Sequence, residues 1–213
     1  MRSFYRAGVL KMLINQLSAY KADTVALQEI RWTGSGILEK RDCTLFYSCD
    51  NKGKLGTGFL VSKRIKHLIT DFKSIAPRIC TLRTRGKFFN YSFINGHAPT
   101  ELSDDEEKDG FLDALERAYD TSPRNDIKIV LSDFKARVDK EPVNFHTTGN
   151  YSLRSLMNDN GSQLIQFAVS RNIIIESTFH PHKDIHKSTW RSPDGVTFNQ
   201  TDHLLVERNI NLT

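Results

Sequence analysis

The stretch that decides the fold is Asp23-Thr24-Val25-Ala26-Leu27-Gln28-Glu29. It is apolar, too short for a helix and bounded by polar residues, which is typical of a buried strand. A second stretch of this kind, Ile127-Lys128-Ile129-Val130-Leu131, runs into Ser132-Asp133-Phe134. Two buried strands are therefore expected, and each ends on a carboxylate.

Short β-rich runs separated by glycine and proline lie between these stretches, and their close spacing predicts antiparallel meanders. The runs are Leu45–Ser48, Thr57–Ser62, Leu68–Ile75, Ile79–Arg83 and Phe88–Ile94. Helical spacing of apolar residues predicts three covering helices, which are Arg6–Tyr20, a helix capped by Ser103 that carries Phe111 to Ala118, and Gly161–Arg171. Further short strands are expected at Ile173–Ile175, Ser188–Trp190 and Thr197–Val206, with a turn at Pro193-Asp194-Gly195. Together these elements predict an α/β fold, a four-layer α/β sandwich of two mostly antiparallel sheets flanked by helices.

The composition is that of one compact globular domain spanning residues 1–213, with 38% hydrophobic and 26% charged residues. No apolar run approaches the roughly 20 residues of a membrane-spanning helix, and the start shows no secretory signal. We therefore expect no membrane association and an intracellular location, nuclear or cytoplasmic. Cys43, Cys49 and Cys80 have no metal-binding or disulfide spacing and are interpreted as reduced packing residues. The net charge of +5 is compatible with a polyanionic partner but does not establish one.

Five short motifs, in this order and spacing, carry a family resemblance. They are Val25-Ala26-Leu27-Gln28-Glu29-Ile30-Arg31-Trp32, His97-Ala98-Pro99-Thr100, Leu131-Ser132-Asp133-Phe134, Thr189-Trp190 and Asn199-Gln200-Thr201-Asp202-His203. The chain resembles the endonuclease/exonuclease/phosphatase family, specifically the endonucleases of RTE/BovB-type non-LTR retrotransposons and the craniofacial development protein 2-like sequences derived from them. The resemblance covers nearly the whole chain and implies Mg²⁺-dependent phosphodiester cleavage, with Mn²⁺ as an alternative ion.

The resemblance implies roles for both strand-end carboxylates. Glu29 matches the metal-binding glutamate of the family, whereas the strand pattern alone favours a solvent-facing residue. Asp133 matches the aspartate that lies beside the attacked phosphate and the metal and orients the water; the alternative is an Asx-type turn residue. Mg²⁺ prefers such carboxylate oxygens and commonly takes only one or two from the protein.

Four other residues are candidates for the site. His97 stands where relatives carry a phosphate-binding side chain, although a loop histidine without a role is the alternative, and Asn95 is an additional candidate. Asp202 and His203 look like a catalytic pair, but their register resembles the earlier motif whose aspartate supports the site and orients the catalytic histidine. Trp190 is a candidate for stacking on a sugar or base, with a core aromatic at a hairpin as the favoured alternative. A run with metal-like spacing, His180-x-His182-x₃-His186, contains Pro181 and is interpreted as a solvated loop.

The chain departs from the family pattern at position 135, where Lys135 replaces an asparagine. An ammonium group only donates hydrogen bonds and carries charge, so it cannot reproduce an amide that both donates and accepts, although Lys135 could still hold a phosphate. The first family strand and the C-terminal Ser-Asp-His segment are also expected to be missing, so that the domain is truncated at both ends. Exposed strand edges would then make the domain marginally stable or lead a partner chain to cover them.

Three functions remain open from the sequence. The first is a working Mg²⁺-dependent endonuclease, the second a catalytically impaired domain that still binds nucleic acid or protein, and the third a remnant of a decayed retroelement. The residues rank the second and third above the first. The expected partner is nucleic acid, with DNA favoured.

Overall fold

The structure is a computed structural model that describes residues 8–140, 146–153, 156–192 and 194–208. The chain divides into two compact units, one made of Met1–His97 and Leu112–Lys128 and the other of Ala98–Phe111 and Ile129–Thr213. The expected helix residues before position 8 and Pro193 of the expected turn lie outside the described residues.

The first unit contains two antiparallel sheets. One has the strand order β1 (Thr24–Gln28), β4 (Thr57–Ser62), β3 (Cys43–Ser48) and β2 (Ser35–Glu39), and the other contains β5 (Ile69–Ala76), β6 (Ile79–Thr84) and β7 (Tyr91–His97). A short 3₁₀ turn, η1 (Lys66–Leu68), leads into β5. The two sheets face each other, because Phe46 packs on Phe72 at 5.5 Å between ring centroids and the hydroxyls of Ser48 and Ser74 are 2.5 Å apart.

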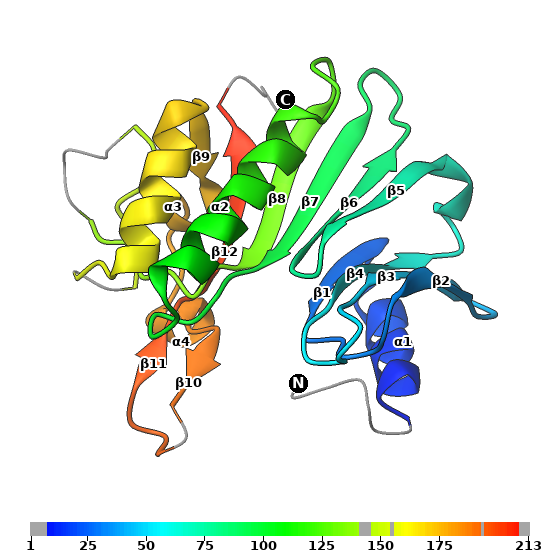
Figure 1. Cartoon of the computed structure of the whole chain (residues 1–213), viewed down its shortest axis with the longest axis horizontal. Coiled ribbons are helices and arrows are strands. Elements are labelled where there is room, and N and C mark those ends of the chain that lie inside the picture. Colours follow the sequence, from blue (N-terminus) through cyan, green and yellow to red (C-terminus); the bar gives the residue numbers. More distant parts are fainter. Residues whose placement is uncertain (1–7, 141–145, 154–155, 193, 209–213) are drawn as a thin grey trace. The chain divides into compact units, whose positions relative to one another are not determined.

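Helices cover the outer faces of these two sheets. Helix α1 (Val9–Ala19) packs its apolar side against Leu27, Leu45 and Leu60 of the first sheet (Figure 1). The second half of α2 (Asp105–Asp120) lies on the outer face of the other sheet, where Ala118 lines a small cavity together with Arg83 of β6. The first unit therefore has four layers, and the predicted α/β sandwich of mostly antiparallel sheets with flanking helices is confirmed.

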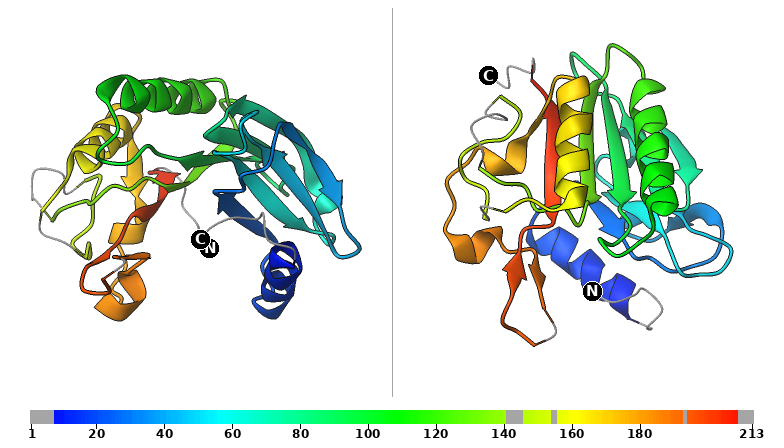
Figure 2. Two further views of the ribbon diagram at one scale, coloured as in Figure 1. Left: turned by 60° about the horizontal axis from the view of Figure 1, so that its bottom comes forward. Right: turned by 60° about the vertical axis from the view of Figure 1, so that its left-hand side comes forward.

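The second unit is built on strand β12 (Asp202–Glu207), which pairs antiparallel with both β8 (Ile127–Asp133) and β9 (Ile173–Ile175). Helix α3 (Asp159–Ser170) packs its buried side chains beside β9, and the coloured ribbon shows it alongside β9 (Figure 2). The remaining elements are η3 (Glu176–Thr178), α4 (Asp184–Lys187) and a hairpin of β10 (Trp190–Arg191) and β11 (Phe198–Asn199).

Local signals account for most element boundaries. The side chain of Asn158 accepts a hydrogen bond from the Gly161 amide and caps α3, and Asp104 accepts from the Glu107 amide at the start of α2. Asp104, and not the expected Ser103, therefore makes the capping contact. Strand β2 was not expected from the sequence, because Gly34 and Gly36 interrupt its apolar alternation.

The three cysteines are buried and free, as predicted. Among the described residues, no helix is long and apolar enough to cross a membrane.

Candidate active site

The predicted site residues lie in both units. In the first unit, Glu29 directly follows β1 and adopts a left-handed backbone conformation, with φ of 55°. The next residue, Ile30, is fully buried and donates its amide to the Gly56 carbonyl at 3.2 Å. The Glu29 side chain is 32% exposed, and its carboxylate lies 3.3 Å from the guanidinium of Arg31. The burial of Ile30 thus fixes the chain while leaving the carboxylate accessible.

Asn95 holds the two sheets together beside this strand end. Its amide nitrogen donates to the carbonyls of Leu27 and Gly58 at 2.9 and 2.7 Å, and its oxygen accepts from Gln28 at 2.7 Å. The residue is fully buried. Because these bonds occupy its amide group, Asn95 is placed to position the end of β1 and not to contact a substrate, which changes the role expected from the sequence.

The structure brings His97 to Glu29. His97 ends β7, is 4% exposed, and its Nε2 lies 3.9 Å from the Glu29 carboxylate. Its backbone is held on both sides by Arg78, whose carbonyl accepts from the His97 amide at 3.0 Å and whose guanidinium donates to the His97 carbonyl at 3.2 Å. A carboxylate and an imidazole from distant parts of the sequence therefore meet at the ends of two strands.

The Glu29 carboxylate fits a water-rich Mg²⁺ ion, which commonly uses only one or two protein carboxylates and keeps several waters. It is partly exposed, and the ion pair with Arg31 that would have to give way is a surface pair of little stability. A closed multi-ligand cage is not seen, since the described part of the chain contains no group of three or more His, Cys, Asp or Glu side chains able to hold a metal.

In the second unit, Asp133 and Asp202 are directly opposite each other on β8 and β12. Directly paired residues of an antiparallel sheet project to the same face with Cβ atoms about 5 Å apart, so the two predicted carboxylates share one face. Desolvation raises the pKa of Asp202 above its ordinary value, although a hydrogen bond with Thr189 lowers it in part. Both candidate carboxylates of this unit thus lie on one face of the paired strands β8 and β12.

Lys135 has an unfavourable backbone conformation for its residue type. Its φ is 51°, in the left-handed region that asparagine tolerates and that long side chains rarely adopt. The loop is nevertheless well bonded, because the Lys135 amide donates to the Asp133 carboxylate at 3.2 Å and the Lys135 carbonyl accepts from Asn158 at 3.0 Å. Ser132 is buried, and its hydroxyl has no hydrogen-bond partner among the described residues.

His203 lies on the opposite side of β12 from Asp202 and is 4% exposed. Its Nε2 is 3.0 Å from the carbonyl of Ala136, to which it must donate, and its Nδ1 is 2.9 Å from the hydroxyl of Ser177. Burial lowers the pKa of His203 to about 4, so the ring is neutral at physiological pH. Both ring nitrogens of His203 are therefore engaged in hydrogen bonds inside this unit.

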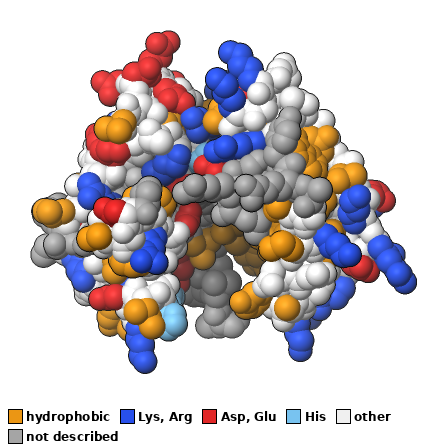
Figure 3. Space-filling view, turned by 90° about the horizontal axis from the view of Figure 1, so that it is seen from below, with side chains coloured by type: hydrophobic (Ala, Val, Ile, Leu, Met, Phe, Trp, Pro, Cys, Tyr) orange, Lys and Arg blue, Asp and Glu red, His pale blue; other side chains and the backbone are white. Residues whose placement is uncertain are grey.

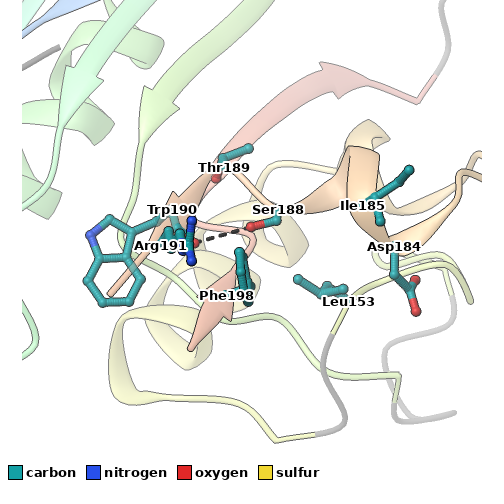
Figure 4. Close-up of a pocket in the computed structure, with 8 residues that line it drawn as sticks. All are labelled: Leu153, Asp184, Ile185, Ser188, Thr189, Trp190, Arg191 and Phe198. Atoms are coloured by element: carbon teal, nitrogen blue, oxygen red, sulfur yellow. Dashed lines mark hydrogen bonds between the residues drawn. The ribbon is translucent and has the colours of Figure 1, made fainter. Parts of the chain in front are cut away.

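Trp190 is 44% exposed and lines a cavity of about 610 Å³ at the β10–β11 hairpin. Arg191 lies over the Phe198 ring at 5.1 Å from its centroid and donates to the Gly195 carbonyl. Figure 4 shows Phe198 between Trp190 and Leu153 in this cavity. The cavity lining is Leu153, Asp184, Ile185, Ser188, Thr189, Trp190, Arg191 and Phe198. The sequence analysis named Trp190 as a candidate but not the other residues that line the cavity, which come from four separate segments.

Comparison with solved structures defines the class of fold. The endonuclease domain of TRAS1, a telomere-specific non-LTR retrotransposon, superposes with a TM-score of 0.60 at 13% identity, covering 97% of this chain and 83% of that one. An endonuclease/exonuclease/phosphatase family protein from Leptotrichia buccalis gives 0.59 at 12% identity, covering 97% and 85%. D. rerio TDP2 in complex with a single-strand DNA product gives 0.58 at 13% identity, covering 92% and 75%. The chain has the endonuclease/exonuclease/phosphatase fold.

Comparison with curated proteins gives the particular resemblance. The chain is 26% identical to craniofacial development protein 2 of Bos taurus over 203 residues, which cover 94% of this chain and 34% of the relative. The protein of the same name from Tragulus javanicus is 27% identical over 203 residues, covering 94% and 35%. The chain thus spans about a third of the length of these relatives. No protein-family model matches the chain. These similarities confirm the resemblance drawn from the sequence motifs.

Proposed function

We propose that this chain is a retrotransposon-derived, endonuclease-type domain that binds nucleic acid and a divalent cation, and whose phosphodiester hydrolysis is impaired at position 135. The observation that carries the proposal is the meeting of Glu29 and His97 at the ends of β1 and β7. Buried hydrogen bonds from Asn95 to the carbonyls of Leu27 and Gly58 fix the end of β1 beside Glu29. A strand end that only faced solvent would not need them. The fold shared with a retrotransposon endonuclease supports the same conclusion.

Each residue of the site has a proposed role. Glu29 holds Mg²⁺, or Mn²⁺ in its place, and the bound ion neutralises charge that develops on the phosphate oxygens. His97 donates a hydrogen bond to a phosphate oxygen or orients the Glu29 carboxylate at 3.9 Å. On the second unit, Asp133 orients water, and Asp202 shares its face of the sheet. His203 supports the loop at Ala136 through its buried hydrogen bond.

Lys135 is the reason for proposing impaired activity. An asparagine at this position would offer both a donor and an acceptor in a fixed plane, whereas the ammonium of Lys135 only donates and brings a positive charge. Lys135 is therefore proposed to contact phosphate without replacing the orienting amide.

The proposed partner is nucleic acid, with DNA favoured. The support is the fold shared with the TRAS1 endonuclease and with D. rerio TDP2, whose structure contains a single-strand DNA product. Lys and Arg side chains occur across the face seen in Figure 3, which is compatible with a polyanion. A second polypeptide remains the proposed alternative for the outer edge of β1, an outermost strand of its sheet.

A plasmid-nicking assay tests the proposal. The chain is incubated with supercoiled DNA and Mg²⁺ beside an EDTA control, and Glu29→Ala is compared with Glu39→Ala, which removes an exposed carboxylate paired with Lys66. We expect slow Mg²⁺-dependent nicking that Glu29→Ala abolishes and Glu39→Ala leaves intact. Equal nicking by the chain and its Glu29→Ala variant would reject the proposed role of Glu29.

A non-catalytic binding domain is the second candidate, favoured by Lys135 in its left-handed conformation. In that case no nicking occurs, but DNA binding weakens with salt because counterions are released when phosphates are contacted. Absence of both nicking and salt-dependent binding would instead favour a remnant of a decayed retroelement.

A further inference from the structure

Two adjacent phenylalanines are exposed in the loop that connects β6 to β7. Phe88 is 82% exposed and Phe89 is 58% exposed. The loop precedes Tyr91 and so lies at the opposite end of β7 from His97, about 20 Å away along the strand. Figure 1 shows this loop at the end of β6 and β7 that points away from the sheet of β1 and β4. The pair of aromatic rings is therefore separate from the candidate site formed by Glu29 and His97.

The loop has a tight turn at Gly86 and a backbone hydrogen bond at each end. A Cβ atom at Gly86 would lie 2.0 Å from the Phe89 carbonyl oxygen and 2.7 Å from the Tyr91 ring, so only glycine fits this tight turn. The Arg85 amide donates to the Leu68 carbonyl at 2.8 Å at one end of the loop, and at the other end the Asn90 carbonyl accepts from the Ile127 amide at 2.8 Å. The backbone that carries both exposed rings is thus anchored at the turn and at each end of the loop.

Cationic side chains surround the two rings. Arg85 and Lys87 are exposed in the same loop, and the Lys87 ammonium lies 5.1 Å from the centroid of the Phe88 ring. Arg124 is exposed in the neighbouring turn, close in sequence to the Ile127 amide that bonds to the loop. The acid of that turn, Asp126, is buried and already paired with Arg83 at 2.7 Å. The loop therefore combines flat apolar rings with positive charge.

We propose that this loop, Arg85–Asn90, is a second nucleic-acid contact that binds single strands through stacking of bases on Phe88 and Phe89. Single-stranded nucleic acid has the matching chemistry, since its unpaired bases stack on aromatic side chains while phosphates pair with Lys and Arg. A lipid surface fits less well, because the apolar area consists of two rings without the broad apolar face that membrane-binding segments present.

The proposal extends the nucleic-acid role proposed above, but it is measured by binding alone and does not require cleavage. Failure of cleavage with intact loop binding would refute only the active-site proposal. Loss of loop binding with intact cleavage would refute only this one.

The test is fluorescence anisotropy of a fluorescein-labelled 20-nucleotide oligo-dT, titrated with the chain in EDTA. The double variant Phe88→Leu/Phe89→Leu keeps apolar bulk but removes the aromatic faces, and Phe88→Tyr/Phe89→Tyr keeps them. Leu102→Ala, at a 96% exposed position elsewhere, is the matched control. We expect the leucine variant to bind about 10-fold or more weakly, as loss of base stacking requires, and the tyrosine variant and the control to bind like the parent.

Two further measurements complete the test. Arg85→Gln/Lys87→Gln should reduce the slope of log K against log salt by about 1.4, since each contact with a single strand contributes about 0.7. Vesicles of phosphatidylcholine with phosphatidylserine are tested in parallel by flotation. Absence of oligo-dT binding, unchanged affinity of the leucine variant, or vesicle binding that replaces oligo-dT binding would each overturn the proposal.

Discussion

Replacement of Lys135 by asparagine is expected to stabilise the chain. Lys135 has φ of 51°, a conformation that costs a non-glycine residue roughly 1 kcal/mol or more and that asparagine adopts more readily. The variant keeps both backbone hydrogen bonds of the residue, from its amide to Asp133 and from Asn158 to its carbonyl. We therefore expect Lys135→Asn to raise the free energy of unfolding by about 1 kcal/mol, a rise in Tm of about 2–4 °C for a chain of this length.

Thermal and urea unfolding measure this effect, and two control variants isolate its cause. Lys135→Gly should stabilise through the same relief of backbone strain, reduced by the greater entropy of glycine in the unfolded chain. Lys135→Ala removes the charge but retains the penalty of a Cβ atom at positive φ. If alanine stabilised the chain as much as asparagine, the charge of Lys135 and not its backbone would be responsible, and the reasoning would be refuted.

Three other predictions concern stability. Asn95→Ala removes the buried hydrogen bonds to the Leu27 and Gly58 carbonyls and the acceptor of Gln28, and should lower the free energy of unfolding by about 3 kcal/mol in urea titrations; a change under about 0.5 kcal/mol would contradict its role between the sheets. Arg83 holds the pKa of Asp126 below its ordinary value, so this stabilisation is present at neutral pH and lost as pH falls through the lowered pKa; Asp126→Asn should cost about 2 kcal/mol at pH 7 and less in acid. Burial lowers the pKa of His203 from 6.5 to about 4, so on acidification the unfolded chain takes up a proton at a higher pH than the folded chain does. The free energy of unfolding should therefore fall by up to roughly 3 kcal/mol as the pH is lowered from 6.5 to about 4. A His203→Gln variant that shows the same loss would contradict this.

Much of the fold follows from local patterns in the sequence. The short apolar runs that end at Glu29 and Asp133 form β1 and β8, because a buried strand leaves a strong and continuous apolar signal. Strand β9 has the expected bounds, Ile173–Ile175. Strand β2 was missed, since its glycine-interrupted alternation and exposed residues carry a weak signal.

The candidate site was predictable only in part. The family resemblance named both Glu29 and His97 as site candidates, and the structure places the Nε2 atom of His97 3.9 Å from the Glu29 carboxylate. The buried bonds of Asn95 and the engagement of His203 depend on partners distant in sequence, which periodicity cannot reveal. The strained backbone of Lys135 is likewise a tertiary property, because the residue type itself disfavours it.

The nicking rate of Lys135→Asn, measured with and without Glu29→Ala, shows whether cleavage depends on Glu29 and is impaired at position 135. We expect Lys135→Asn to nick supercoiled DNA in Mg²⁺ faster than the parent chain, by about 10-fold or more, because the amide orients the reacting phosphate. Adding Glu29→Ala should abolish the gain. A rate that stays unchanged in Lys135→Asn, or a gain that survives Glu29→Ala, would contradict an endonuclease-type site that depends on Glu29 and is impaired at position 135.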